Sequence, residues 1–271
     1  MSAPLYEREL ATAVAIAHEA GALLKENFGR EQVIDYKGRI NLVTEMDRAS
    51  ERLIISKLNA AFPADDILAE EGGGERRGSQ RLWIVDPLDG TTNYAHEYPV
   101  WSVSIALQEA GYLKVGVVYN PLLDDTYAAR RSGGTTLNGK PRRVTECDDL
   151  SKAMLGTGFS YDLSGDFESN NIGPFSRFLL KAQAVRRAGS AALAIAKVGV
   201  GRSDGFWEGG LQPWDMAAGM LIVEEGGGKT SNYEGGPAEV TARKLVATNG
   251  RIHDAMLSVL ASRVASAEPR S

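Results

Sequence analysis

Cysteine and histidine are scarce in this sequence, which limits the kinds of site that it can form. Its 271 residues include one cysteine, Cys147, and three histidines. A single cysteine cannot close an internal disulfide bond, which fits a reducing compartment such as the cytoplasm. His18, His96 and His253 lie far apart in the chain, so we expect each to be structural or at the surface. A zinc site or a catalytic triad built on histidine is therefore not expected.

Long apolar runs and an excess of positive charge are also missing. No run of about 18 uncharged apolar residues occurs, and the N-terminal MSAPLYEREL lacks the apolar core of a secretory signal. We therefore expect a cytoplasmic protein that is neither secreted nor membrane-spanning. Asp and Glu total 35 against 30 Lys and Arg, a net charge of −5, which argues against direct nucleic-acid binding. A bound anion would have to be attracted by something other than overall charge.

What is present is the composition of a globular protein, with 43% hydrophobic and 24% charged residues. The length suits one large or two ordinary domains. Apolar residues spaced three and four apart predict a helix over residues 10–28. A second helix is predicted from Thr44, which can cap it, to Phe62, just before Pro63. Short strands are predicted at 67–69, 82–85, 101–107 and 113–119, the last two joined as an antiparallel hairpin.

After about residue 150 the pattern changes to helices that alternate with strands. The predicted helices lie near residues 173–184, 190–199, 213–225 and 251–263. The whole pattern predicts α/β or α+β layers. We expect a division near residue 145, which gives an N-terminal α+β subdomain, 1–145, with most of the candidate metal ligands, and a C-terminal α/β subdomain, 146–271.

Acidic residues follow two of the predicted strands. Glu70 and Glu71 come directly after the strand at 67–69, and Asp86 and Asp89 follow the strand at 82–85. Ligand sites favour the ends of strands in layered sheets. Asp215 lies two residues after Pro213, at the start of a predicted helix. Taken singly, each acid has a simpler explanation, as a turn residue, a solvated loop residue or a partner of the helix dipole.

Together these acids indicate an oxygen-lined site for a hard cation such as Mg²⁺. Pro87 between the two aspartates would expose the carbonyl oxygen of Leu88 as a further ligand. Gly90 lets the backbone approach a ligand closely, and the N–H groups of Gly90, Thr91 and Thr92 would begin a short helix suited to binding phosphate. The sequence therefore predicts metals held by acids and a phosphate held by the metals and backbone amides.

Four segments together resemble the inositol monophosphatase family, lithium-sensitive and magnesium-dependent phosphatases related to fructose-1,6-bisphosphatase. They stand in the family's order and spacing, and the resemblance covers nearly the whole chain: LVTEMD at 42–47, LAEEGG at 68–73, WIVDPLDGTTNYAH at 83–96 and PWDMAAG at 213–219. The resemblance implies a layered α/β fold with an antiparallel-rich first sheet and a smaller second sheet. It also implies hydrolysis of inositol monophosphate to inositol and phosphate, and a homodimer.

The resemblance also implies roles for individual residues. Glu70, Asp86 and the Leu88 carbonyl would hold a first Mg²⁺. A second would be held by Asp86, Asp89 and Asp215, and a third, weaker ion would lie near Glu70.

For catalysis, the family implies a metal-activated water as nucleophile. Glu70 and the hydroxyl of Thr91 would activate that water, and Asp47 would orient Thr91. The phosphate would contact Gly90 and Thr91. The inositol hydroxyls would contact a set of substrate-binding residues made up of Asp89, Gly189, Ser190, Ala191, Glu208 and Asp215.

Two departures from the family pattern limit what the resemblance implies. Gln212-Pro213 precedes Trp214-Asp215, where animal members usually carry His-Cys; bacterial members carry the proline. This leaves the preferred leaving group open among inositol, histidinol, sugar and nucleotide phosphates. The polar, glycine-rich segment 72–78 is expected to be a mobile flap. Bacterial relatives that act as partners of the transcription machinery supply a different, non-catalytic alternative.

Overall fold

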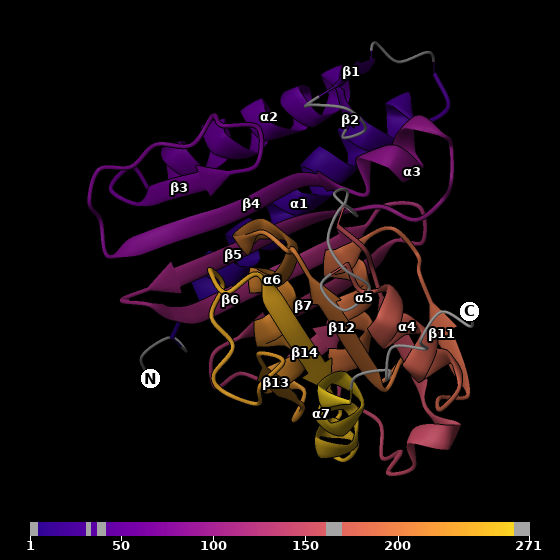
Figure 1. Ribbon diagram of the computed structural model, residues 1–271. Coiled ribbons are helices and arrows are strands. Elements are labelled where there is room, and N and C mark those ends of the chain that lie inside the picture. The colour runs from indigo at the N-terminus through magenta and orange to yellow at the C-terminus, as the bar shows by residue number, and fades with distance from the viewer. Residues whose placement is uncertain (1–4, 31–33, 37–41, 161–169, 263–271) are drawn as a thin grey trace.

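Two β-sheets drawn from different halves of the chain organise the fold (Figure 1). The computed structural model describes residues 5–30, 34–36, 42–160 and 170–262. The larger sheet has its strands in chain order, and every neighbouring pair is antiparallel except the parallel pair β3 and β4. Its strands are β3 (Asp66–Ala69), β4 (Arg81–Asp89), β5 (Ser102–Glu109), β6 (Tyr112–Asn120), β7 (Asp125–Arg130), β8 (Thr135–Leu137) and β9 (Lys140–Arg142).

The smaller sheet is mixed, with the order β11-β10-β12-β14-β13. The strand β10 is parallel to both of its neighbours, and β14 is antiparallel to both of its own. These strands are β10 (Met154–Thr157), β11 (Ala184–Arg186), β12 (Gly205–Gly209), β13 (Lys229–Ser231) and β14 (Lys244–Thr248). The predicted layered α/β fold, with an antiparallel-rich first sheet and a smaller second one, is confirmed. The subdomain boundary near residue 145 stays a prediction.

Helices cover both faces of each sheet. The helices α1 (Glu7–Asn27) and α2 (Glu45–Ala61) pack on one face of the larger sheet, and α5 (Ala191–Gly199) and α6 (Pro213–Glu225) lie between the sheets. On the outer side of the smaller sheet lie α4 (Ile172–Leu179) and α7 (His253–Ala261). The strands alternate accordingly: Trp83 and Val85 face α1 and α2, whereas Ile84 faces the layer of α5 and α6.

The remaining elements are short. They are β1 (Ile34–Tyr36), paired with β2 (Leu42–Thr44), the five-residue α3 (Thr91–Ala95) and the 3₁₀ helix η1 (Leu150–Lys152). No helix in the described part of the chain is both long and apolar enough to cross a bilayer.

Local sequence signals explain where the main helices begin. The side-chain oxygen of Thr44 accepts hydrogen bonds from the backbone N–H groups of Met46 and Asp47, and Asp47 Oδ2 accepts from the Thr44 N–H at 2.7 Å. This reciprocal capping box starts α2 at the predicted place. In α6, Pro213 occupies the first turn, and Asp215 Oδ2 accepts a hydrogen bond of 2.7 Å from the Gln212 N–H.

The helix predicted over 173–184 is wrong in its second half. The helix α4 ends at Leu179, and residues 184–186 form β11, an edge strand that pairs in parallel with β10. Leu179 and Leu180 are exposed, so the apolar pattern that suggested a longer helix does not reflect burial there. The helix predicted over 251–263 forms as α7 between His253 and Ala261, and residue 263 lies outside the described residues.

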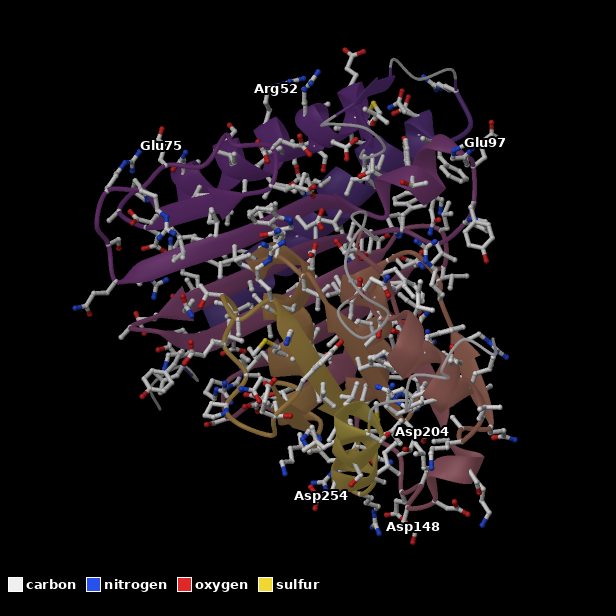
Figure 2. The ribbon with its side chains drawn as sticks, in the orientation of Figure 1. Arg52, Glu75, Glu97, Asp148, Asp204 and Asp254 are labelled. Carbon is white, nitrogen blue, oxygen red and sulfur yellow. The ribbon has the colours of Figure 1, made fainter. Side chains whose placement is uncertain are left out.

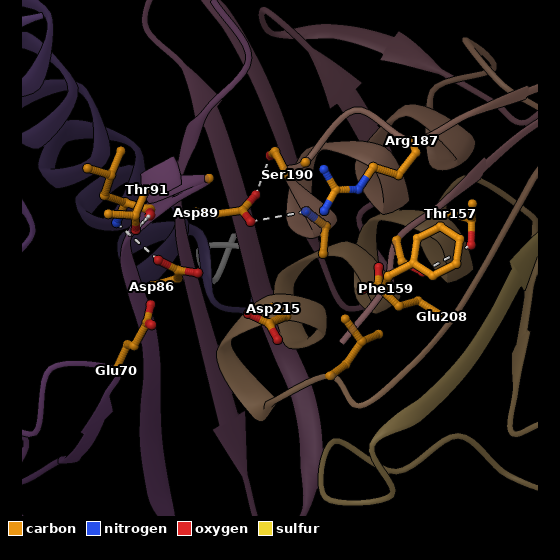
Figure 3. A pocket seen from close by; sticks show the side chains of 16 residues that line it. Glu70, Asp86, Asp89, Thr91, Thr157, Phe159, Arg187, Ser190, Glu208 and Asp215 are labelled. Atoms are coloured by element: carbon orange, nitrogen blue, oxygen red, sulfur yellow. Dashed lines mark hydrogen bonds between the residues drawn. The ribbon is translucent and has the colours of Figure 1, made fainter. Parts of the chain in front are cut away.

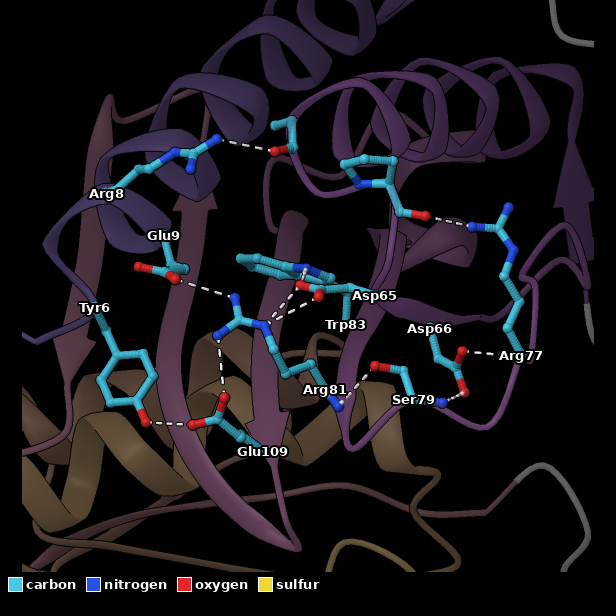
Figure 4. A network of polar contacts seen from close by, with 12 residues as sticks. Tyr6, Arg8, Glu9, Asp65, Asp66, Arg77, Ser79, Arg81, Trp83 and Glu109 are labelled. Atoms are coloured by element: carbon cyan, nitrogen blue, oxygen red, sulfur yellow. Dashed lines mark hydrogen bonds and ion pairs between the residues drawn. The ribbon is translucent and has the colours of Figure 1, made fainter.

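Ionic contacts tie the edge of the larger sheet to α1 (Figure 4). Arg81 in β4 pairs with Glu9 of α1, with Asp65 and with Glu109 of β5, at 3.0, 3.0 and 3.2 Å. Asp65 also accepts a hydrogen bond of 2.9 Å from the indole N–H of Trp83. Elsewhere, many charged side chains lie at the periphery (Figure 2), for example Arg52, Glu75 and Glu97. The acids described next are buried or partly buried instead.

Candidate active site

One pocket gathers the predicted site residues where the larger sheet meets α5, α6 and β12 (Figure 3). Every residue predicted to bind metal, phosphate or substrate lines it. Asp47 does not line it, but contacts Thr91 from behind. The lining residues are Glu70, Asp86, Leu88, Asp89, Gly90, Thr91, Thr157, Gly158, Phe159, Arg187, Gly189, Ser190, Ala191, Glu208, Leu211 and Asp215.

A β-bulge in β4 explains how Asp86 and Asp89 reach the same pocket. Side chains alternate along a regular strand, so residues three apart would face opposite sides of the sheet. Here Asp86 pairs with Ser104 and Asp89 with Ser102, so two residues of β4 stand opposite one residue of β5. Pro87, which has no N–H for the ladder, lies inside this irregularity. The extra residue turns both carboxylates to one side.

Asp89 is held by the start of α5. Its Oδ1 accepts a hydrogen bond of 3.0 Å from the Ala191 N–H, and its Oδ2 accepts one of 3.0 Å from the Ser102 hydroxyl and another from the Ser190 hydroxyl. Burial raises the pKa of Asp89, and these hydrogen bonds oppose that rise. The predicted contact residues Ser190 and Ala191 therefore also fix the position of a predicted metal ligand.

Asp86 lies among three other acids of the pocket. It is buried, and its pKa lies well above the ordinary value because of burial and then the nearby charges of Glu70, Asp89 and Asp215. The Leu88 N–H, 3.0 Å from Asp86 Oδ1, works against this shift. Burial likewise raises the pKa of Asp215 to about 8, and the charges of Asp89 and Glu70 add to the rise.

Glu208 reaches the pocket from the smaller sheet. It lies in β12, and Figure 3 places its side chain across the pocket from Asp86 and Glu70. Burial, and then the charges of Asp215 and Asp89, raise its pKa to about 8, against the opposing charge of Arg187. Its exposed fraction is only 9%, so Glu208 is not a solvated acid at the end of a strand.

The Thr91 hydroxyl lies between Asp47 and the backbone of β4. Its Oγ1 is 2.8 Å from Asp47 Oδ1 and 3.1 Å from the Leu88 carbonyl oxygen. Asp47 is buried, and burial raises its pKa, whereas hydrogen bonds from Thr44 and Thr91 lower it. Because Asp47 belongs to the capping box of α2, that helix fixes the acceptor on which Thr91 is oriented.

Gly90, at the start of α3, needs to be glycine for two reasons. Its φ is 96°, in the left-handed region that favours glycine. A Cβ atom there would also lie 3.1 Å from the carbonyl oxygens of Gly189 and Val100. The turn that carries Thr91 therefore packs backbone to backbone against the segment that carries Ser190.

The chemistry of these residues fits a divalent metal. Among the described residues, no group of three or more His, Cys, Asp or Glu side chains is already close enough together to hold an ion. Glu70, Asp86, Asp89 and Asp215 nevertheless share one pocket. The charges of Glu70 and Asp89 raise the pKa values of both Asp86 and Asp215. Carboxylate and carbonyl oxygens are the ligands that Mg²⁺ favours, and a cation among them would relieve their repulsion.

The glycine-rich segment 72–78 does not have the contacts of a free flap. The two carboxylate oxygens of Glu51 accept hydrogen bonds from the N–H groups of Glu71 and Gly73, at 2.7 and 2.9 Å. Asp66 accepts from the N–H groups of Arg77, Gly78 and Ser79 (partly drawn in Figure 4). Mobility of this segment stays a prediction, and these two acids oppose it.

Sequence reasoning missed five lining residues: Thr157, Gly158, Phe159, Arg187 and Leu211. The first three end β10 or follow it, and the strand-end rule that located Glu70 would have pointed to them had this strand been recognised. Arg187 stands in the RRAGSAA segment beside the predicted contact residues. Leu211 follows β12 and carries no chemical signal.

A layered α/β fold with a carboxylate-rich pocket at strand ends fits an enzyme that hydrolyses phosphate esters with the help of metal ions. The family model described as "Inositol monophosphatase family" matches residues 6–265. The chain belongs to the inositol monophosphatase family, and it is an enzyme of the phosphatase class.

Individual relatives agree with this assignment. An "Inositol-1-monophosphatase" of Synechocystis sp. is 43% identical over 94% of this chain and 88% of its own length. A "Nus factor SuhB" of Pseudomonas aeruginosa is 40% identical over 92% of this chain and 94% of its own. The solved structure of an inositol monophosphatase from Anabaena (Nostoc) sp. superposes with a TM-score of 0.88, at 39% identity, over 96% of this chain and 98% of that one.

Proposed function

We propose that the protein is a Mg²⁺-dependent phosphomonoesterase that hydrolyses inositol monophosphate to inositol and phosphate. The observation that carries the proposal is the meeting of Glu70, Asp86, Asp89, Thr91 and Asp215 in one pocket. A protein that only bound a partner would have no need of this set. The printed name of the relative from Synechocystis sp. supports inositol monophosphate as the substrate.

Two to three Mg²⁺ ions are proposed for each site. Glu70, Asp86 and the Leu88 carbonyl would hold the first, and Asp86, Asp89 and Asp215 the second, with a weaker third near Glu70. The bulge that brings Asp86 and Asp89 to one side of β4 supports a shared ligand. When bound, the ions would lower the pKa of a water molecule and neutralise charge on the phosphate.

The protein's own groups would then position the reactants. Glu70 would take the proton of the attacking water, and the Thr91 hydroxyl, which donates to Asp47 at 2.8 Å, would accept a hydrogen bond from that water. The N–H groups of Gly90 and Thr91 would hold the phosphate oxygens. A bond would form from the water oxygen to phosphorus as the bond from phosphorus to the inositol oxygen breaks, and the proton given up by the water balances the one that the leaving oxygen takes up.

On the inositol side, recognition would rest on hydroxyl contacts. Glu208 contributes a carboxylate from β12, and the segment Gly189–Ala191 contributes the start of α5. Asp89 and Asp215 line the same pocket. Sugar hydroxyls are hydrogen-bond donors, and a buried acceptor left without a donor is costly. Glu208 would therefore favour polyol esters over esters without hydroxyls.

A phosphate-release screen tests the substrate directly. The wild-type protein would be assayed with inositol 1-phosphate, fructose 1,6-bisphosphate, histidinol phosphate and adenosine 2′-phosphate, each with Mg²⁺ and with a chelator. The highest kcat/KM on inositol 1-phosphate, abolished by the chelator, is the expected result. A higher value on another ester would assign the protein to that alternative, and full activity with the chelator would overturn the metal requirement.

A second candidate, partnership with the transcription machinery, rests on one observation. The relative from Pseudomonas aeruginosa with 40% identity is named a Nus factor. Immobilised protein would be incubated with purified RNA polymerase; direct retention, unchanged in a variant without activity, would favour this role. Homodimer formation and a cytoplasmic location are part of the proposal too, and size-exclusion chromatography with light scattering tests the first.

A further inference from the structure

Gly158 and Glu208 lie in direct contact, each one residue beyond the last pair of β10 and β12, Thr157 and Trp207. A Cβ atom built on Gly158 would lie 2.2 and 2.4 Å from the two carboxylate oxygens of Glu208 and 2.5 Å from its Cδ. These are the three nearest atoms, and all belong to one side chain. Only glycine at position 158 therefore leaves room for the Glu208 carboxylate in its observed position.

The need for glycine here comes from this contact and not from the backbone angle. Gly158 is absent from the residues with positive φ in the described chain, so an L-residue can adopt its conformation. The groups that would collide with a new methyl group are the end of a flexible side chain. An alanine at this position should fold normally and displace the carboxylate.

The backbone of Gly158 is held in place and cannot easily yield instead. Asn171 Nδ2 donates to the Gly158 carbonyl oxygen at 2.6 Å and lies 3.0 Å from Thr157 Oγ1. Asn171 Oδ1 in turn accepts a hydrogen bond of 2.7 Å from the indole N–H of Trp207. Asn171 is 5% exposed and Trp207 is fully buried. Thr157 Oγ1 donates to the Trp207 carbonyl oxygen at 2.7 Å, which ties β10 to β12 once more.

We propose that Gly158 is a positioning residue for substrate selection: its missing side chain sets where the Glu208 carboxylate meets the hydroxyl groups of a polyol phosphate. This inference rests on the proposed function. It assigns selectivity to a residue that acts through the Glu208 carboxylate, with its own backbone held by Asn171. The preference for substrates with hydroxyl groups thus depends on Gly158, which has no acidic or basic side chain.

Kinetics with two esters, on Gly158→Ala, Glu208→Gln and the double variant, test the proposal. Inositol 1-phosphate carries the hydroxyl groups, and p-nitrophenyl phosphate lacks them. Gly158→Ala should raise KM for inositol 1-phosphate at least about tenfold, the loss expected for a hydrogen bond to a charged group. Its kcat on both esters and its KM for p-nitrophenyl phosphate should stay within about twofold of wild type.

Gly133→Ala is the matched control. A Cβ at Gly133 would likewise meet the flexible side chain of Arg130, at 2.5 Å from Cγ, on an exposed turn away from the pocket. Its kinetics should match wild type on both esters. In the double variant, Gly158→Ala should add little to the loss caused by Glu208→Gln, because both changes remove the same contact.

Two results would overturn this inference alone. One is an equal loss on both esters in Gly158→Ala, which would place Gly158 at the reacting phosphate. The other is additive losses in the double variant, which would separate Gly158 from Glu208. If wild-type enzyme with Mg²⁺ hydrolysed neither ester, this inference and the proposed function would fall together.

Discussion

Thr91 and Asp47 are joined by a hydrogen bond of 2.8 Å between Oγ1 and Oδ1 that links α3 to the first turn of α2. The same Asp47 side chain closes the capping box of α2 through Thr44. A structural device, the helix cap, therefore orients a proposed catalytic hydroxyl. Thr91 also lines the pocket, as Glu70 does.

Thr91→Ala should lower kcat by about 10²–10⁴-fold with little change in KM, because the hydroxyl is proposed to act on the attacking water and not on substrate binding. Thr91→Ser keeps the hydroxyl and should retain most of the activity. Steady-state kinetics on inositol 1-phosphate provide the measurement. A change confined to KM in Thr91→Ala would move Thr91 from catalysis to binding.

Asp86→Asn should abolish turnover, because Asp86 is the ligand proposed to be shared by both principal ions. The same variant should melt at a higher temperature than wild type without metal, since it removes a buried charge that Glu70, Asp89 and Asp215 repel. Thermal melts with chelator and with Mg²⁺ would show both effects, and the stabilisation by Mg²⁺ should shrink in the variant.

Asp125→Asn is the control for that experiment. Asp125 is buried to a similar extent but is paired with Arg202. Neutralising it should lower the melting temperature, since it breaks a pair instead of relieving repulsion. A lower melting temperature in both variants would contradict the repulsion assigned to Asp86.

The acids of the site could be predicted from the sequence because each stands beside a local signal, either an apolar strand segment or the start of a helix. Glu70 follows β3, Asp86 and Asp89 lie in the last four residues of β4, and Asp215 stands in the first turn of a proline-started helix. The resemblance to the inositol monophosphatase family then indicated that these acids belong to one site. What the sequence could not supply is the bulge in β4, because register depends on the partner strand β5.

The parts that escaped prediction depend on contacts between distant segments. Gly158 reads as an ordinary loop glycine until Glu208 and Asn171, from two other segments, are placed around it. The strand β11 has only three residues, and it exists because β10 offers an edge to pair with. Local propensity decides neither feature, since tertiary pairing overrides it.

Lithium should inhibit the enzyme, an expectation that follows from the proposed function. Li⁺ is small and could take the place of Mg²⁺ at a weak, carboxylate-lined site once phosphate has formed, which would trap the product. Activity on inositol 1-phosphate would be measured in millimolar LiCl and in NaCl at equal ionic strength. Equal activity in the two salts would count against the third, weakly bound ion.

His253 should make the fold sensitive to acid. It is fully buried at the start of α7, with Nδ1 3.0 Å from Thr248 Oγ1 and Nε2 3.0 Å from Ser231 Oγ. Burial, and then the charge of Lys229, lowers its pKa from 6.5 to about 4, with the charge of Asp254 opposing the change. Between these two values the unfolded chain binds a proton that the folded protein does not.

The stability that His253 contributes is therefore present above pH 6.5 and is lost as the pH falls toward 4. The free energy of unfolding should drop by up to roughly 3 kcal/mol across this window on account of His253 alone. Urea melts of wild type and His253→Asn at several pH values isolate the contribution of His253 to the free energy of unfolding. The carboxylates titrate in both proteins, so their effect cancels in the difference. His253→Asn should be less stable at pH 7.5 and should lose less stability on acidification. Parallel pH profiles for the two proteins would show that His253 has the same pKa in the folded and unfolded states, which would contradict the shift assigned to its burial.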